Sequence, residues 1–402
     1  MLDVWPALPL AIWCYGDYLP RSVDNIIAVL EHRDRVCQID LAFFRNSDLE
    51  LILAAMQQPF PELTRLLLHP SVEMGVPVIP DSFLGGSAPR LRYLNFTGIP
   101  FPGLPKLLLS ATHLVVLLLY GIPHSGYFSP EALVSALSAS TSLSSFSLEF
   151  QSPRSCPDQA NRRHPPLTRS VLPFLTSFWF KGVTEYLEDL LAHIDAPRLN
   201  SLHTTFFNDI VFDIPQLMQL ISRAPTSKAL EKVHIVFKNC DARLRFSSGE
   251  SGDGNVYVGL EIICQGLGWQ ISTLEQVCTS CLPPLSMLED LYIYENTYSP
   301  PDWKDDIENG LWLQLLRPFT AVKNLYLSEQ IALRIGPALQ EIAEGRTMEV
   351  LPALQNIFLD RLKSSGQEGI GKFVAARQVA SRHIAVSTSQ KRSDHHKAFG
   401  MK

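Results

Sequence analysis

A repeated spacing of apolar residues is the feature that most constrains how this chain folds. The pattern is an apolar residue, two further positions, an apolar residue, one position and an apolar residue, as in Leu63, Leu66 and Leu68. With 46% apolar residues, one match arises by chance at roughly a tenth of all positions. Only the recurrence of this triplet along the chain is therefore significant. The triplets begin at Val36, Leu63, Leu91, Leu114, Leu143, Leu175, Leu199, Leu230, Leu288, Val322 and Leu354.

The spacing of the triplets is close to regular. Successive triplets begin 27, 28, 23, 29, 32, 24 and 31 residues apart, then 58, 34 and 32. We interpret the interval of 58 as two repeats and place the missing unit at the apolar stretch 256–263. Twelve units then average about 29 residues, close to the upper end of the leucine-rich range.

Prolines support the repeat. Five units carry a proline two residues before the leading apolar residue, where its fixed φ suits the extended start of a strand. These are Pro61, Pro89, Pro173, Pro197 and Pro352.

Segments with helical spacing separate the triplets. Ser129 offers a capping hydroxyl before Pro130 and an early acid, which is typical of a helix start. Further candidate helices are 48–57, 184–193, 214–223, 311–317, 331–344 and 369–382. The alternation predicts an α/β fold, an irregular leucine-rich-repeat solenoid (horseshoe) of about twelve units. Its parallel strands would line the concave face and its helices the convex face.

The ends of the chain differ from its middle. Residues 1–30 lack a clear triplet, so we expect an N-terminal cap or remnant there, followed by the solenoid over 31–386. Residues 387–402 are polar and basic, which is typical of a disordered tail. We interpret 246–255 as a flexible turn and 154–166 as a surface loop.

Charge and cysteine usage narrow the class of protein. The formal charge of −6 disfavours a nucleic-acid partner, because phosphate contacts need a basic face. The seven cysteines are odd in number and scattered, which is not typical of a disulfide framework. This usage favours a reducing compartment inside the cell, either the cytoplasm or the nucleus. The longest strongly apolar run, 114–120, is too short to span a bilayer, and no signal peptide is evident, so no membrane partner is expected.

Candidate chemistry is sparse. Cys278 and Cys281 form the one close cysteine pair, but no second ligand pair accompanies them. Gly249, Gly252 and Gly254 lack the Lys-Ser/Thr of a phosphate loop and suit a hairpin-like turn. The acidic cluster Asp302, Asp305, Asp306 and Glu308 has no histidine partner and suits a solvated loop. The sequence therefore predicts no catalytic residues, no metal and no cofactor.

A candidate binding surface follows from strand geometry. Side chains alternate along a strand, so the residues between the second and third apolar positions, and beside them, face the concave surface. The first units place Gln38, Asp40, Arg65, His69, Tyr93 and Asn95 there. The candidate partner-binding residues are Asp290, Tyr292, Tyr294, Tyr326, Phe358 and Asp360, with Trp179 nearer the middle. Aromatic residues with a few charges are typical of protein hot spots. The alternative is that Tyr292, Tyr326 and Phe358 stack on one another as structural neighbours.

Six stretches of the sequence resemble a known family. They are WPALPL (5–10), LEHRDRVCQIDL (30–41), DSFLGGSAPRL (81–91), GIPFPGLPKLLLSAT (98–112), FTAVKNLYLS (319–328) and VLPALQN (350–356). They resemble fungal F-box proteins with leucine-rich-repeat-like C-terminal regions, which form a large group in mushroom-forming fungi. The matching residues belong to the repeat framework, so the resemblance identifies the family but no catalytic or binding residue.

The resemblance implies a role in ubiquitin ligation. In such proteins an N-terminal F-box docks on the Skp adaptor of a cullin-RING ubiquitin ligase, and the repeats capture the substrate. Here the triplets begin by Val36, and Leu8-Pro9-Leu10 lacks the acid of an F-box start. The chain thus resembles the substrate-recognition part alone, a non-catalytic scaffold that binds a protein on its concave face. The alternative is a stand-alone interaction scaffold or a gene fragment, and an enzyme is the least favoured reading.

Overall fold

A computed structural model of the chain describes twelve segments: residues 8–15, 22–71, 75–153, 169–207, 214–223, 230–248, 257–280, 285–303, 307–343, 350–360, 367–379 and 382–389. The fold is α/β, with a large, mostly parallel sheet whose strands alternate with helices. The strand order is β1-β2-β3-β4-β5-β6-β8-β10-β13-β12-β11-β14-β15-β16-β17. The chain divides into two compact units, described separately below.

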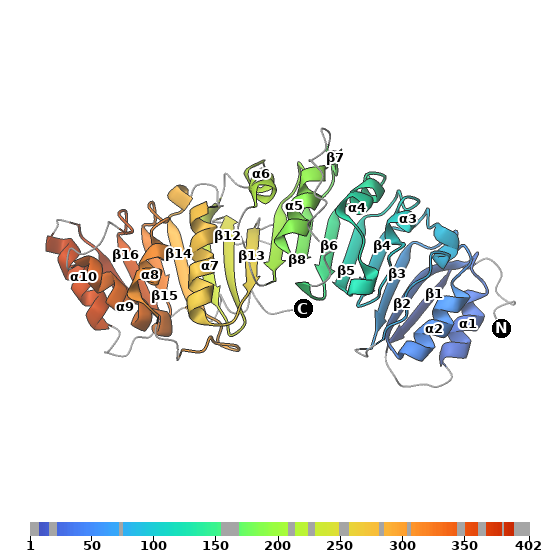
Figure 1. The fold of residues 1–402 in the computed structure, drawn as a ribbon, viewed down its shortest axis with the longest axis horizontal. Helices are drawn as coiled ribbons and strands as arrows, with labels where there is room; N and C mark the ends of the chain where they lie inside the picture. The colour runs from blue at the N-terminus through green and yellow to red at the C-terminus, as the bar shows by residue number, and fades with distance from the viewer. Residues whose placement is uncertain are drawn as a thin grey trace. The chain divides into compact units, whose positions relative to one another are not determined.

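Unit 1 comprises Met1–Leu202 with a short piece at Arg223–Pro225. Its strands are β1 (Leu10–Tyr15), β2 (Val36–Phe44), β3 (Arg65–Pro70), β4 (Tyr93–Thr97), β5 (Val116–Ile122), β6 (Ser145–Phe150) and β8 (Ser177–Gly182). Its helices are α1 (Ser22–Leu30), α2 (Asn46–Ala55), α3 (Leu104–Leu108), α4 (Pro130–Leu137) and α5 (Thr184–His193). Short 3-10 turns occupy Phe83–Gly86 and His124–Gly126, and β7 (Ser170–Val171) pairs with β9 (Ile194–Asp195). From β1 to β6 each strand pairs in parallel with the next, and β6 pairs in parallel with β8 (Figure 1).

Unit 2 comprises His203–Ser222 and Thr226–Lys402. Its strands are most of β10 (Ser201–Phe206), then β11 (Leu230–Phe237), β12 (Asp241–Ser248), β13 (Tyr257–Ile263), β14 (Asp290–Glu295), β15 (Asn324–Leu327), β16 (Asn356–Asp360) and β17 (Ala385–Ser389). Its helices are α6 (Pro215–Arg223), α7 (Leu267–Ser280), α8 (Asn309–Leu316), α9 (Glu329–Ala343) and α10 (Gln367–Val379), with a 3-10 turn at Leu285–Met287. β14 to β17 run parallel, and β12 is antiparallel to both β11 and β13.

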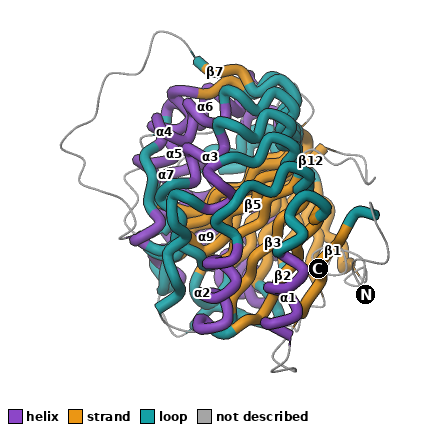
Figure 2. The backbone as a smooth tube through the Cα atoms, turned by 90° about the vertical axis from the view of Figure 1, so that its right-hand side faces the viewer, coloured by secondary structure: helices purple, strands orange, loops and turns teal. Residues whose placement is uncertain are grey.

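The triplets form strands as predicted. All eleven lie at or within a strand, and their second and third residues point into the core, as Leu325 and Leu327 do at 0% and 2% exposure. The described helices cover that side of the sheet in each unit (Figure 2). We call the opposite side the open face. Alternation therefore predicted the inward position of the second and third triplet residues.

The helices also agree with their predicted positions. All six further candidate segments contain helices, and α5 has the predicted bounds. At the start of α4, Ser129 Oγ accepts a hydrogen bond from the backbone N–H of Ala132 at 3.2 Å. A hydroxyl cap followed by proline thus marked this helix start correctly.

The prolines have a different role from the one predicted. In each of the five units the leading residue donates its backbone N–H to the carbonyl three residues earlier, as Leu63 does to Phe60 at 3.2 Å. The proline therefore occupies the second position of a hydrogen-bonded turn, which its fixed φ favours. It begins a turn before the strand and not the strand itself.

The interval of 58 residues is also organised differently. A strand does form at 257–263 (β13), but β14 pairs directly with β11, so no regular unit lies between them. β11, β12 and β13 instead form an antiparallel meander in which β13 lies on the other side of β12. The prediction of one more repeat in sequence was wrong. The turn expected at 246–255 overlaps β12 up to Ser248, and 249–256 lie outside the described residues.

Both ends contain more structure than predicted. The N-terminal 30 residues contribute β1 and α1, and β17 extends across residue 387 to Ser389. A strand can pair through its backbone without a leucine triplet. The triplet pattern therefore did not reveal β1 or β17. Residues 390–402 and the loop predicted at 154–166 lie outside the described part of the chain.

Helix packing in unit 2 gives a testable result. A Cβ built on Gly369 of α10 would lie 2.7 Å from the backbone carbon of Gly336 in α9, whereas one on Gly371 meets nothing within 4 Å. We expect Gly369→Ala to lower the free energy of unfolding by about 1–3 kcal/mol through overpacking. Gly371→Ala, the matched control, should raise it slightly because alanine favours helix. Urea denaturation of both variants checks this, and equal effects would contradict the close helix contact.

Candidate functional site

Four rings form a row along the open face of unit 2. His234, Tyr292, Tyr326 and Phe358 occupy paired register positions on β11, β14, β15 and β16. Adjacent ring centroids are 4.3, 4.1 and 4.4 Å apart, with interplanar angles of 10°, 6° and 9°. We call these residues the aromatic row. Three of them were predicted from the sequence. His234 was missed because a further unit was expected between its strand and the strand of Tyr292, whereas β11 and β14 pair directly.

The rings of the aromatic row stack on one another, as expected if they have a structural role in the sheet. His234 is buried and the other three rings are half-buried between their neighbours. Such aromatic pairs contribute about 0.5–1.5 kcal/mol beyond burial. Burial, followed by the neighbouring Tyr326, raises the pKa of Tyr292, and burial also raises the pKa of Tyr326. Both hydroxyls therefore stay protonated at neutral pH and can exchange hydrogen bonds. Stacking fixes the rings but leaves their outer edges on the open face.

A second row of polar side chains runs beside the first. Asn324 Nδ2 donates to Asp290 Oδ1 at 2.7 Å, and Asn356 Nδ2 donates to Asn324 Oδ1 at 2.8 Å. These three residues occupy paired register positions two residues before the rings on β14, β15 and β16. We call them the polar row. It holds Asp290 in place next to the aromatic row.

The remaining predicted site residues lie in different places. Tyr294 meets the His234 ring edge-on at 6.1 Å and 84°. Burial raises the pKa of Tyr294 to about 12, although nearby arginines act to lower it. Asp360 lies two residues after Phe358 on the same face of β16. Trp179 belongs to β8 of unit 1, where its Nε1 donates to Ser177 Oγ at 3.2 Å, so it is not part of the aromatic row.

Unit 1 carries a smaller aromatic contact on its open face. Arg65 Nε donates to the two carboxylate oxygens of Asp40 at 3.0 and 2.9 Å. The guanidinium carbon of Arg65 also lies 3.9 Å from the centroid of the Tyr93 ring. Arg65 and Tyr93 are register partners on β3 and β4. The arrangement combines an ion pair with a cation–π contact.

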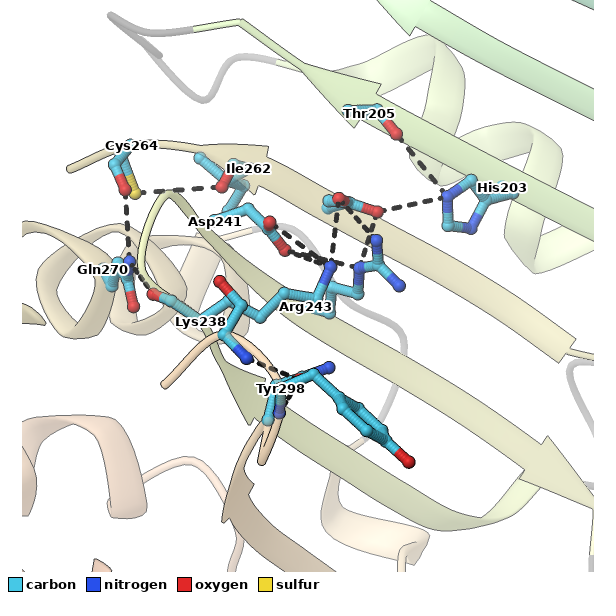
Figure 3. Close-up of polar contacts among 12 residues, drawn as sticks. His203, Thr205, Lys238, Asp241, Arg243, Ile262, Cys264, Gln270 and Tyr298 are labelled. Atoms are coloured by element: carbon cyan, nitrogen blue, oxygen red, sulfur yellow. Dashed lines mark hydrogen bonds and ion pairs between the residues drawn. The ribbon is translucent and has the colours of Figure 1, made fainter. Parts of the chain in front are cut away.

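The meander of unit 2 contains a cluster of charges that the sequence analysis missed (Figure 3). Arg243 Nη2 donates to Glu261 Oε1 at 2.8 Å, and Arg243 Nε lies 2.7 Å from Glu261 Oε2. Lys238 Nζ lies 2.9 Å from Asp241 Oδ1, and His203 Nε2 lies 3.6 Å from Glu261 Oε2. We call these five residues the charged cluster. Its partners come from β10, β12, β13 and the end of β11, so no short motif could reveal it.

The pKa values within the charged cluster move in opposite directions. Burial acts to raise the pKa of Glu261, but His203, Arg243 and Lys238 outweigh it and lower the pKa to about 2. Burial and the charge of Glu261 raise the pKa of Asp241. Glu261 therefore holds its charge and keeps both cations in place. The cluster ties the meander together through side chains as well as backbone.

Most of the other sequence candidates lie outside the described residues. Of the acidic cluster, Asp302 and Glu308 are described, whereas 304–306 lie outside the described residues, as do Cys281, Gly249, Gly252 and Gly254. No group of three or more His, Cys, Asp or Glu in the described part could hold a metal ion. Among the cysteines described there, Cys14, Cys37, Cys240 and Cys264 are free thiols, and Cys278 is buried in α7. No described helix is long and apolar enough to cross a bilayer.

Comparison with known proteins adds no identification. No protein-family model matches the sequence, and no curated protein matches it.

Proposed function

We propose that the chain is a leucine-rich-repeat type solenoid that binds a protein partner on the open face of unit 2. The repeat supports the architecture, because strand and helix alternate at the spacing of the triplets. A unit of this kind buries one side of its strands beneath helices and presents the other to a ligand. In this proposal the chain binds its partner and catalyses no reaction.

The aromatic row is the observation that carries this proposal. Protein hot spots favour large aromatic residues near the centre of an interface. Stacking between 4.1 and 4.4 Å already holds Tyr292, Tyr326 and Phe358 in one arrangement. A partner that packs on them loses little additional side-chain freedom, which improves affinity. The structural role of the stack and the binding role thus support each other.

Affinity capture followed by mass spectrometry tests the proposal. The wild-type chain is compared with Tyr292→Ala/Tyr326→Ala and with Trp269→Ala, which removes a 71%-exposed aromatic ring from α7 in the helix layer. We expect one or more partners to be retained by the control and weakened at least ~30-fold by the double variant. Circular dichroism should show all three proteins folded. Equal recovery of every partner by the three would contradict a binding role for the aromatic row.

The same experiment separates two forms of the scaffold. The resemblance to F-box proteins supports a substrate receptor of a cullin-RING ubiquitin ligase, and Skp adaptor and cullin should then be captured with the partner. A stand-alone scaffold would capture the partner without them. In both forms the aromatic row contacts the partner, and the adaptor would bind elsewhere.

A further inference from the structure

Two cysteines lie at the ends of neighbouring strands of the meander. Asp241 and Ile263 form the last register pair of β12 and β13. Cys240 immediately precedes Asp241, and Cys264 immediately follows Ile263. Because the two strands are antiparallel, their register carried one residue further sets Cys240 opposite Cys264. Facing residues of antiparallel strands have Cα atoms about 4.5–5.5 Å apart, which is within the range that a disulfide spans.

The side chain of Gln270 supports the same arrangement from the helix layer. Gln270 of α7 is fully buried, and its Nε2 donates to the backbone carbonyls of Lys238 at 2.7 Å and of Cys264 at 3.1 Å (Figure 3). The backbone N–H of Lys238 in turn donates to the carbonyl of Asp241 at 2.9 Å and closes the turn that contains Cys240. One nitrogen atom therefore joins the turn of Cys240 to the backbone of Cys264, independently of the strand register.

The two thiols belong to the same side of the sheet but differ in exposure. Ala242 and Ile262 are buried register partners beneath the helices, and alternation along each strand places Cys240 and Cys264 on that side. Cys240 is exposed, whereas Cys264 is partly buried. Burial and the charge of Asp241 raise the pKa of the Cys264 thiol to about 11, so it stays protonated at neutral pH. An oxidant in solution therefore reaches Cys240 first.

We propose that Cys240 and Cys264 form a reversible disulfide when the chain meets a peroxide. Hydrogen peroxide oxidises the Cys240 thiol to a sulfenic acid, and one water is released. The Cys264 sulfur then bonds to the Cys240 sulfur, and the thiol proton leaves with the sulfenic hydroxyl as a second water. Both sulfurs are thereby oxidised and the peroxide is reduced by two electrons. This modification site is independent of the proposed binding function.

The bond would join the turn between β11 and β12 to the end of β13, next to α7. Closing the loop 240–264 restricts the unfolded chain, so the folded state gains relative stability. β11 also carries His234, at which the aromatic row begins. Oxidation should therefore stabilise unit 2 on the strand where the aromatic row starts.

Peptide mapping tests the pairing directly. The full chain is reduced, freed of reductant, treated with hydrogen peroxide and alkylated with N-ethylmaleimide before digestion with trypsin and Glu-C. Cleavage after lysine, arginine and glutamate isolates Cys240 in peptide 239–243 and Cys264 in peptide 262–275, apart from the other cysteines. We expect most molecules to yield these two peptides joined by a disulfide, and to yield them separately after treatment with dithiothreitol.

Stability gives a second measurement. The urea midpoint of unit 2, followed by circular dichroism, should rise when the wild type is oxidised and fall back when it is reduced. Cys240→Ser changes an exposed side chain, so the variant should fold normally but lose both the joined peptide and the rise in midpoint. Cys14→Ser alters a free thiol of β1 in unit 1 and is the matched control, which should keep both.

The mapping decides between this site and other thiol chemistry. Recovery of Cys240 as a sulfenic acid or a more oxidised form, with Cys264 still alkylated, would overturn the proposal. A bond from either residue to a different cysteine, or between the Cys240 residues of two chains, would do the same. Equal changes of midpoint in the wild type and Cys240→Ser would show that oxidation acts elsewhere. Capture of a partner plays no part in these outcomes, so the disulfide and the binding function can fail separately.

Discussion

Leu325→Asp should abolish cooperative folding of unit 2. Leu325 is fully buried at the centre of β15, and its register partners Leu291 and Ile357 are also at 0% exposure. Replacing Leu325 with aspartate would remove the free energy gained by burying an apolar side chain. It would also bury a carboxyl group, charged or protonated, without a hydrogen-bond partner. We expect a loss of more than about 5 kcal/mol, which is comparable with the whole stability of many domains.

Urea denaturation followed by circular dichroism and tryptophan fluorescence measures this loss. Trp312 of α8 is 1% exposed and reports on packing in unit 2. Leu325→Met is the matched control, because it keeps the volume and the apolar character and should cost less than about 1.5 kcal/mol. An Asp variant with the midpoint of the wild type would mean that the assignment of inward and outward residues on β15 is wrong.

Local patterns predicted the parts of the fold that burial decides. Leu66 and Leu68 face the core because a strand that is covered on one side must alternate. The same rule placed Tyr292, Tyr326 and Phe358 together on the other side. Their contact follows from equal register in successive parallel strands, which the repeat implies. These three rings occupy the same position in successive units, so this part of the site could be predicted from the sequence.

Features that depend on strand order could not be predicted in this way. Arg243 of β12 and Glu261 of β13 alternate with buried residues, as they would in any exposed strand. They meet only because β12 turns back between β11 and β13, a choice made by long-range backbone pairing. His234 joins the aromatic row because β14 pairs with β11 across the meander. No spacing within a single repeat encodes that pairing.

Glu261→Gln should destabilise unit 2 by about 3–5 kcal/mol at neutral pH. The substitution keeps the shape of the side chain but removes the charge that neutralises Arg243 and Lys238 in a largely buried place. Glu289→Gln is the matched control, because Glu289 pairs with Lys323 at 54% side-chain exposure and should contribute less than about 1 kcal/mol. Urea denaturation of the three proteins, at constant ionic strength, gives the comparison.

The dependence on pH separates charge from packing. The pKa of Glu261 is about 2 in the folded chain, below the ordinary value of 4.5. Its stabilising contribution is thus fully present above about pH 4.5 and is lost as the pH falls toward 2. Asp241, whose pKa is raised by burial and by the charge of Glu261, acts in the opposite direction, and it does so more strongly in the wild type because the Glu261→Gln variant lacks that charge. Asp241 therefore offsets part of the Glu261 contribution. We expect that difference to shrink steadily between pH 4.5 and 2. A difference that stayed constant across this range would show that Glu261 stabilises the meander by packing and hydrogen bonding, with no net contribution from its charge.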